Sequence, residues 1–306
     1  MKRIGLICGG FSSEYDISLK SAQTIQKNFP DHLECQLIEI SRSNWQQRIH
    51  NAGEIDAAII YTHGDPGENG RIQAYLDMLQ IPYINSGVLA SALSFDKWYC
   101  NQFLRGFGFA VAKSQRFHYG AQINASSLVK ELGLPLFVKP SDSGSSYGIS
   151  KVKSLNEVQK AFEIAFNEGR NVVAEAFLDG IEVTCGVFRS TTELVALPLT
   201  EIVSETEFFD YAAKYEGKSK EITPARVEED TKLVVQAQAK KIYELLGLRG
   251  LARIDFMLVK NQPFVIEVNT TPGFSPASIV PQMLGVAGIN IQDFWKEIIK
   301  VELGTR

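Results

Sequence analysis

Two stretches near the C-terminus, residues 253–259 (RIDFMLV) and 264–269 (FVIEVN), decide the fold. Both are rich in β-branched and aromatic residues, and a short polar segment separates them, so they predict a β-hairpin with its turn over 260–262. Side chains alternate between the two faces of a strand, so one face of this hairpin is apolar. We expect that face to be core, formed by Ile254, Phe256, Leu258, Phe264, Ile266 and Val268.

The opposite face of the hairpin concentrates charge. Antiparallel pairing sets Asp255 opposite Glu267 and Arg253 opposite Asn269. Two facing carboxylates with an amide oxygen beside them form a cluster of hard oxygen ligands, which Mg²⁺ prefers together with water and substrate phosphates. The alternative is a solvated sheet face with a cross-strand ion pair. Like charges are seldom set directly opposite each other without a cation, which favours the metal site.

Length, composition and charge limit the classes of protein to consider. The chain has 306 residues, of which 45% are hydrophobic and 22% charged, as in ordinary globular proteins of two or three domains. The net charge of −4 argues against a general nucleic-acid binder, which needs a basic surface. No apolar run approaches about 20 residues, so we expect no membrane span. Four scattered cysteines and a first segment unlike a signal peptide indicate a reducing cytoplasm.

The hydrophobic pattern predicts a mixed α/β fold in three domains. Residues 1–93 alternate strand and helix in the manner of a doubly wound, Rossmann-like domain. A long helix over 88–104 leads into a second unit, 94–179, and a third unit spans 180–306. Within the third unit, a continuous strand is expected over 194–203. The polar stretch 204–223 lacks periodicity and is too long for a simple connection, so we expect a functional lid loop there.

A Gly/Ser-rich loop at 141–148 follows an apolar strand that ends in Lys139. Backbone N–H groups of small residues can converge on phosphate oxygens, and the lysine supplies a positive charge. A hairpin turn with an exposed lysine explains this motif equally well when it is taken alone. The segment 212–219 fits a permissive Walker A pattern, but Pro224 blocks the helix that must follow, so we reject it.

Collinear motifs over nearly the whole chain resemble those of the D-alanine–D-alanine ligases in the ATP-grasp superfamily. They lie at 9–14, 63–70, 91–97, 138–146, 175–182, 209–215, 224–225, 253–255 and 267–273. The resemblance implies ligation of two D-alanines through an acyl phosphate, with release of ADP and phosphate, for peptidoglycan synthesis. It also implies ATP, two Mg²⁺ ions for which Mn²⁺ can substitute, and a cytoplasmic homodimer without nucleic-acid or membrane partners.

The resemblance also implies roles for individual residues. Metal ligands fall on Asp255, Glu267 and Asn269. Nucleotide contacts fall on Lys97, Lys139, Ser145, Ser146, Glu175, Phe177, Leu178 and Glu182. The first D-alanine is assigned to Glu14 and His63, and the second to Lys214, Ser278 and Ile279. Catalytic roles fall on Glu14, Ser145 and Tyr215, which form a bridge between domains, and on Arg253 and the Gly273 N–H, which stabilise an oxyanion.

Some positions depart from the family pattern. Ala176 replaces a lysine that reaches the adenine in many relatives, and 274–279 differs from the usual run after Pro-Gly. Tyr215 favours D-alanine over D-lactate as second substrate and leaves D-serine open. Three alternatives remain: an ATP-grasp ligase with a different second substrate, a nucleotide-binding regulatory module, and an unrelated sugar- or phosphate-binding α/β protein.

Overall fold

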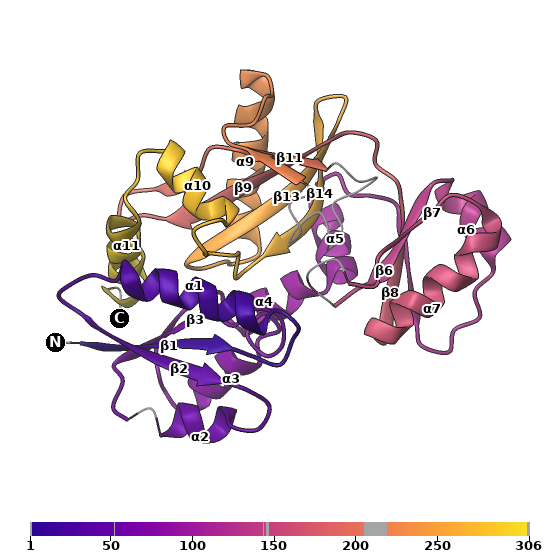
Figure 1. Cartoon of the computed structure of the whole chain (residues 1–306). Coiled ribbons are helices and arrows are strands. Elements are labelled where there is room, and N and C mark those ends of the chain that lie inside the picture. The colour runs from indigo at the N-terminus through magenta and orange to yellow at the C-terminus, as the bar shows by residue number, and fades with distance from the viewer. Residues whose placement is uncertain (1, 52, 143, 145–146, 205–218, 305–306) are drawn as a thin grey trace.

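The computed structural model describes residues 2–51, 53–142, 144, 147–204 and 219–304, and in these ranges the strands form three sheets (Figure 1). The expected mixed α/β class is confirmed. Each sheet takes its strands from one of the three expected segments. The domain boundaries at 93/94 and 179/180 themselves stay a prediction.

The first sheet is parallel, with strand order β2-β1-β3-β4. Its apolar strands are covered on both faces, as all-parallel sheets require: α1 and α11 pack on one face and α2 and α3 on the other (Figure 1). The elements are β1 (Arg3–Gly9), α1 (Tyr15–Lys27), β2 (Glu34–Ile40), α2 (Trp45–His50), β3 (Ala57–Ile60), α3 (Arg71–Met78), β4 (Tyr83–Ile84) and α4 (Val88–Phe95).

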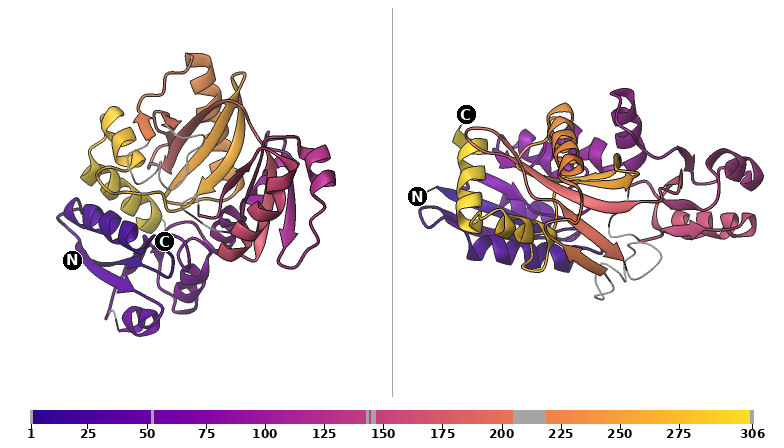
Figure 2. Two further views of the ribbon diagram at one scale, coloured as in Figure 1. Left: turned by 45° about the vertical axis from the view of Figure 1, so that its right-hand side comes forward. Right: turned by 90° about the horizontal axis from the view of Figure 1, so that it is seen from above.

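The second sheet is antiparallel, with order β5-β8-β6-β7, and has its own small core against α6 and α7. In Figures 1 and 2 this unit stands to one side of the rest of the molecule. Its elements are β5 (Ser114–His118), α6 (Ala125–Leu132), β6 (Leu136–Pro140), β7 (Ser150–Val152), the 3₁₀ turn η1 (Leu155–Glu157), α7 (Val158–Glu168) and β8 (Asn171–Ala176).

The third sheet has the order β12-β11-β9-β13-β14, and β10 pairs with β9. Helices α5 and α9 share its core on one face, and α10 and α11 pack between its other face and the first sheet (Figure 2). Its elements are α5 (Lys97–Gly106), β9 (Ile181–Arg189), β10 (Leu194–Ala196), β11 (Thr200–Ser204), β12 (Ser219–Ile222), α9 (Glu229–Leu245), β13 (Leu251–Val259), β14 (Gln262–Asn269), α10 (Ile279–Val286) and α11 (Ile291–Gly304).

The predicted hairpin is β13–β14, and its register is the expected one at the charged end: Asp255 pairs with Glu267 and Arg253 with Asn269. The turn is a two-residue one, in which Lys260 and Asn261 both have positive φ, as type I′ hairpins require.

The predicted apolar face is confirmed for Ile254, Phe256, Leu258 and Val268, which are buried, and is wrong for Phe264 and Ile266 of β14. A register shift between Asp255 and Phe256 pairs Phe256 with Val265, so the extra residue moves β14 to the opposite alternation. Val265 is therefore core, whereas Phe264 is only half-buried and Ile266 lines a cavity.

Three element predictions also need correction. The helix expected over 88–104 is broken at Asp96, which adopts an extended conformation and caps α5 by accepting the N–H groups of Trp98 and Tyr99, each at 3.1 Å. The strand expected over 194–203 is two strands, β10 and β11. The lid loop expected over 204–223 is shorter, because Ser219–Ile222 form β12; residues 205–218 lie outside the described ranges.

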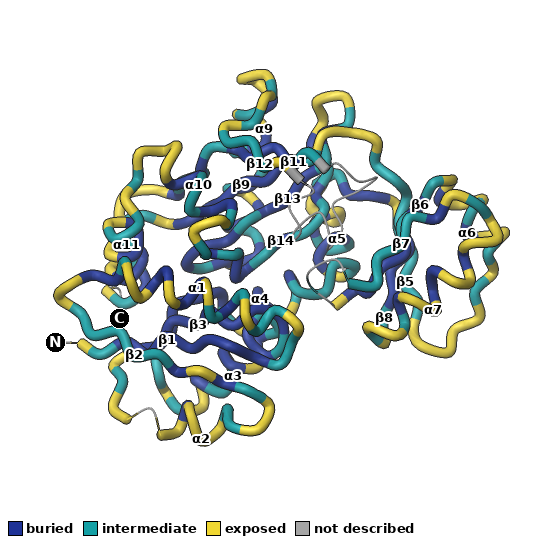
Figure 3. The backbone as a smooth tube through the Cα atoms, in the orientation of Figure 1, coloured by how far each residue is buried: buried dark blue, intermediate teal, exposed yellow. Residues whose placement is uncertain are grey.

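An aromatic cluster joins the first sheet to the C-terminal helices. Phe294 stacks on Phe274 with ring centroids 5.8 Å apart, and Trp295 meets Tyr61 edge-on at 5.9 Å. Figure 3 shows the inner strands of the first and third sheets as largely buried and the outer turns as mostly exposed. No helix in the described ranges is both long and apolar enough to cross a membrane.

We predict that Phe294→Ala lowers the free energy of unfolding by about 3–5 kcal/mol, the range measured when a buried phenylalanine leaves a cavity. The side chain is 1% exposed and packs against both Phe188 and Phe274. Denaturant titration followed by circular dichroism measures the change. Phe107→Ala, at a ring that is 59% exposed, is the matched control and should unfold like the parent. Equal unfolding curves for the two variants would contradict the assignment of the cluster as core.

Candidate active site

A cavity of about 610 Å³ is lined by residues of the second and third sheets and by residues of α1 and of the segment that follows β3. Every predicted site residue that the structure describes lies on its wall. These residues are Glu14, His63, Lys97, Lys139, Glu175, Phe177, Leu178, Glu182, Arg253, Asp255, Glu267, Asn269, Gly273, Ser278 and Ile279. The other four, Ser145, Ser146, Lys214 and Tyr215, lie outside the described residues.

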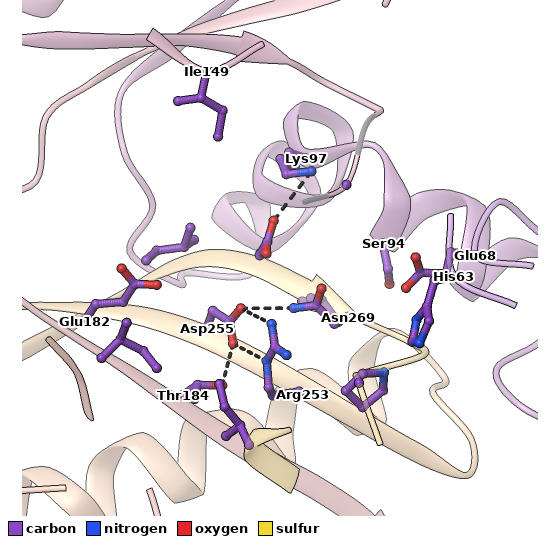
Figure 4. Close-up of a pocket in the computed structure, with 18 of the residues that line it drawn as sticks. His63, Glu68, Ser94, Lys97, Ile149, Glu182, Thr184, Arg253, Asp255 and Asn269 are labelled. Atoms are coloured by element: carbon purple, nitrogen blue, oxygen red, sulfur yellow. Dashed lines mark hydrogen bonds and ion pairs between the residues drawn. The ribbon is translucent and has the colours of Figure 1, made fainter. Parts of the chain in front are cut away.

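Asp255 is the centre of a dense hydrogen-bond network on this wall (Figure 4). Arg253 donates to both of its carboxylate oxygens, each at 2.8 Å, and Asn269 Nδ2 donates to Oδ2 at 3.0 Å. Thr184 on the neighbouring strand β9 donates its hydroxyl to Oδ1. A buried carboxylate needs such partners, because an unpaired charge loses its hydration at high cost.

Arg253 is a permanent cation inside the cavity wall. Burial alone lowers the pKa of the guanidinium, but the charge and hydrogen bonds of Asp255 and the charge of Glu267 reverse this and raise its pKa. The side chain therefore stays charged at any physiological pH. A fixed, poorly hydrated cation of this kind can stabilise negative charge that develops on a bound substrate.

The two lysines of the site are each held by a carboxylate. Lys139 on β6 pairs with Glu175 on the adjacent strand β8, and Lys97 Nζ lies 3.5 Å from Glu267 on β14 (Figure 4). Both lysines are largely buried. Cations balanced in this way are stable in the ligand-free protein and still available to a polyanion, which competes with the carboxylate.

Lys97 is placed by a link between α5 and the end of β6 that the sequence argument missed. Its backbone N–H donates to the Ser141 carbonyl at 2.9 Å, and the Ser141 hydroxyl donates to Asp96, the cap of α5. Arg116 of β5 lies 3.9 Å from the same carboxylate. The link fixes the position of Lys97 relative to the loop that follows Lys139. The aspartate directly before Lys97 was the sequence signal that could have predicted a helix cap at this position.

The N-terminal wall carries two neighbouring carboxylates, Glu14 and Glu68. Glu68 accepts the backbone N–H of Gly64 at 2.7 Å. Burial, and then the charge of Glu14, raise the pKa of Glu68 to about 8, against the opposing hydrogen bond from Gly64. Glu68 is therefore protonated at neutral pH in the ligand-free protein. Glu68 lies within the motif at 63–70 but was not predicted as a site residue.

His63 lies beside Glu68 in the same wall (Figure 4). Burial lowers its pKa, which the charge of Glu14 only partly offsets, so the imidazole is neutral at pH 7. Its Nε2 lies 3.3 Å from the Ser21 hydroxyl. Gly144 of the Gly/Ser-rich loop also reaches this wall, because a Cβ placed on it would collide with the Glu14 carboxylate.

The loop that carries Gly273 is held from the first sheet. Tyr61 donates its hydroxyl to the Pro272 carbonyl at 2.8 Å, and the Phe274 N–H donates to the Ser21 hydroxyl at 3.1 Å. A Cβ on Gly273 would lie 3.0 Å from the Ser278 hydroxyl, so glycine allows the tight approach between these two residues. The backbone of this loop is therefore fixed by contacts both to the N-terminal unit, through Tyr61 and Ser21, and to the start of α10, through Ser278.

The far end of the cavity is more apolar. Phe177 and Leu178 follow β8, and Lys151 of β7 places its ammonium 4.3 Å from the Phe177 ring centroid. Met257 and Ile266 complete this floor and were not predicted: Met257 faces the cavity by alternation with Asp255, and the register shift turns Ile266 toward it. A flat aromatic base fits such a surface, with Glu182 nearby for hydroxyl groups.

Solved structures with the same arrangement of sheets define the class. The D-alanine–D-alanine ligase of Bacillus anthracis complexed with ATP superposes with a TM-score of 0.86 at 30% identity, covering 100% of this chain and 98% of that one. The VanG D-Ala:D-Ser ligase of Enterococcus faecalis gives a TM-score of 0.86 at 29% identity, covering 98% of this chain and 99% of that one. The fold is that of the ATP-grasp ligases.

Sequence comparison narrows the class to one family. A family model described as the D-ala D-ala ligase C-terminus matches residues 103–300. A D-alanine–D-alanine ligase of Parabacteroides distasonis is 41% identical, covering 100% of this chain and 98% of that protein. This chain belongs to the D-alanine–D-alanine ligase family, and the resemblance stated from its motifs is confirmed.

We predict that Glu68→Gln weakens the pH dependence of stability in the ligand-free protein. The pKa of Glu68 is raised from 4.5 to about 8 on folding, so the folded state binds the extra proton between these values. The contribution of Glu68 to the free energy of unfolding must therefore fall as the pH rises from 4.5 to about 8. Thermal unfolding from pH 5 to pH 9 should show a smaller loss for Glu68→Gln than for the parent. Exposed Glu163→Gln is the control, and parallel pH profiles for parent and Glu68→Gln would refute the assignment.

Proposed function

We propose that this chain joins two D-alanines to D-alanyl-D-alanine with ATP, through an acyl phosphate. One observation carries the proposal: Asp255, Glu267 and Arg253 meet on a cavity wall that also gathers Lys97 and Lys139. Transfer of a phosphoryl group to a carboxylate brings two anions together, so the site must concentrate positive charge and fixed donors. Membership of the ligase family supports D-alanine as the amino acid.

The donor set of the hairpin fits Mg²⁺. Asp255 and Glu267 offer carboxylate oxygens from directly opposed positions, and Asn269 adds an amide oxygen beside them. In the part of the chain that is described, no group of three or more His, Cys, Asp or Glu residues could hold a metal ion. A small set of oxygens suits Mg²⁺, which keeps water and phosphate oxygens among its ligands. We infer two ions, for which Mn²⁺ can substitute; bound there, they would neutralise phosphate charge.

The nucleotide contacts follow from the same wall. Lys97 and Lys139 would exchange their carboxylate partners for phosphate oxygens, and the loop after Lys139, with Ser145 and Ser146, would cover the phosphates. The apolar end supplies the base site. We assign the nucleoside to Glu175, Phe177, Leu178 and Glu182.

We propose two amino-acid sites, one on the N-terminal wall and one at the start of α10. Glu14 and neutral His63 would bind the first D-alanine on the N-terminal wall. Ser278 is the N-cap of α10 and Ile279 its first residue, so the N–H groups of the first turn suit the carboxylate of the second. Arg253 and the Gly273 N–H would stabilise the oxyanion of the tetrahedral intermediate. We assign Lys214 to the second carboxylate and a bridging role to Ser145 and Tyr215, in agreement with the motif resemblance.

A second candidate is the same chemistry with a different second substrate. The similarity to a D-Ala:D-Ser ligase favours D-serine as the alternative, while Tyr215 argues against D-lactate. Mass spectrometry of the product, from mixtures of D-amino acids and D-hydroxy acids, separates these outcomes. A regulatory module without catalysis is disfavoured, because disabled relatives normally lose part of the charged set that is intact here. An unrelated sugar or phosphate binder should still bind its ligand after Asp255→Ala.

We further propose a cytoplasmic homodimer that supplies dipeptide for peptidoglycan and has small molecules as its partners, without nucleic acid or membrane. The net charge of −4 supports the absence of a nucleic-acid partner. Light scattering of the purified chain tests the dimer.

A coupled assay for ADP release tests the reaction. The parent should release ADP only when D-alanine is present, and Asp255→Asn should lower kcat by about a hundredfold to a thousandfold, since it removes one charge that holds both Arg253 and the metal. Exposed Asp230→Asn is the matched control and should retain parent activity. Absence of D-alanine-dependent ADP release by the parent would refute the proposed function.

A further inference from the structure

Glu221 is a cavity carboxylate to which neither the motifs nor the family resemblance assigns a role. It lies on β12, opposite Ile202 of β11, which in turn lies opposite Glu182 of β9. All three residues line the cavity, so Glu221 lies on the cavity side of the edge strand. The strand begins at Ser219, directly after residues 205–218.

Gln282 connects Glu221 to the start of α10. Its Nε2 donates to Glu221 Oε2 at 2.9 Å and to the Ala277 carbonyl at 3.1 Å. Ala277 is the residue before Ser278, where the carboxylate of the second amino acid is proposed to bind. The two bonds of one amide group therefore hold the Glu221 carboxylate beside that site.

The surroundings of Glu221 favour a cationic ligand. Burial raises the pKa of Glu221, and the hydrogen bond from Gln282 and the charge of Arg253 offset only part of this rise. Ile202 and Ile279 of the same wall are buried and apolar. Asp255, Glu267 and Glu175 each have a cation within 4 Å, whereas no ion pair to Glu221 occurs within the described ranges. A half-buried carboxylate in this setting gains free energy from a positive group.

An α-amino acid carries its ammonium group on the carbon next to its carboxylate. A molecule whose carboxylate binds at Ser278 therefore has its ammonium within reach of a group that is tied to Ala277. We propose that Glu221, oriented by Gln282, binds the ammonium group of the second amino acid and accepts one of its protons before the nitrogen attacks the acyl phosphate. This inference rests on the proposed function.

The step balances as a simple proton transfer. One N–H bond breaks, the proton moves to a Glu221 oxygen, and the electron pair stays on nitrogen. That nitrogen then forms the C–N bond to give the tetrahedral intermediate, which collapses as the C–O bond to phosphate breaks, and a second nitrogen proton leaves with the phosphate. A carboxylate with a raised pKa is a better base for this transfer than an ordinary one.

The test compares two nucleophiles. Dipeptide formation needs the ammonium site, whereas hydroxylamine, a small neutral nucleophile at pH 8, traps the acyl phosphate of the first D-alanine as a hydroxamate without using it. We expect Glu221→Gln to lower kcat/KM for dipeptide formation by about tenfold to a hundredfold, the loss expected for a hydrogen bond between charged groups. Hydroxamate formation and the KM for ATP should stay at parent values.

Two further variants complete the experiment. Gln282→Met removes the amide that orients Glu221 and should lower dipeptide formation in the same direction by a smaller factor, with hydroxamate formation unchanged. Glu163→Gln, at an exposed glutamate of α7, should leave both products unchanged. Dipeptide formation at the parent rate in Glu221→Gln, or an equal loss of dipeptide and hydroxamate, would overturn the inference. A parent that forms neither product with D-alanine and ATP would instead refute the proposed function.

Discussion

The fixation of the Asp255 charge inside the third sheet is the constraint on which the rest of this structure depends. A carboxylate in that position is tolerated only with several donors around it, and Arg253, Thr184 and Asn269 provide them from three adjacent strands. The donors meet only if β9, β13 and β14 keep their register. The same contacts that satisfy the charge therefore specify the order of the sheet and the position of the site.

The register shift after Asp255 separates the chemistry of the hairpin from its core. Before the shift, polar side chains face the cavity; beyond it, Met257 and Ile266 do so, while Phe256 and Val265 are buried against α5 and α9. One strand pair thus provides a charged wall at one end and an apolar floor at the other. Met257 takes this position by simple alternation with Asp255, whereas Ile266 reaches the cavity because the register shift displaces β14 by one residue.

The cations that we assign to the phosphates and the oxyanion are balanced before any ligand arrives. Lys97 pairs with Glu267, Lys139 with Glu175, and Arg253 with Asp255. This balance limits the cost of burying so many charged groups, and it leaves cations that a phosphate chain can engage by competition. On the N-terminal wall, where Glu14 and Glu68 are close together, the balance is reached by protonation of Glu68. The site is therefore preorganised by charge balance among several side chains, which come from different motifs.

The sequence by itself indicated the mixed α/β class, the hairpin, the Asp255–Glu267 register and residues that line the cavity, because these follow from local periodicity and from motifs that can be read in order. It could not give the break at Asp96, the register shift, the raised pKa of Glu68 or the position of Glu221 in the cavity. Those depend on neighbours that are distant in the chain: Ser141 for Asp96, Glu14 for Glu68, and Gln282 for Glu221. Only the tertiary structure brings such groups within hydrogen-bonding or Coulombic range, and at that range burial and charge decide which side chains are ionised and what they can bind.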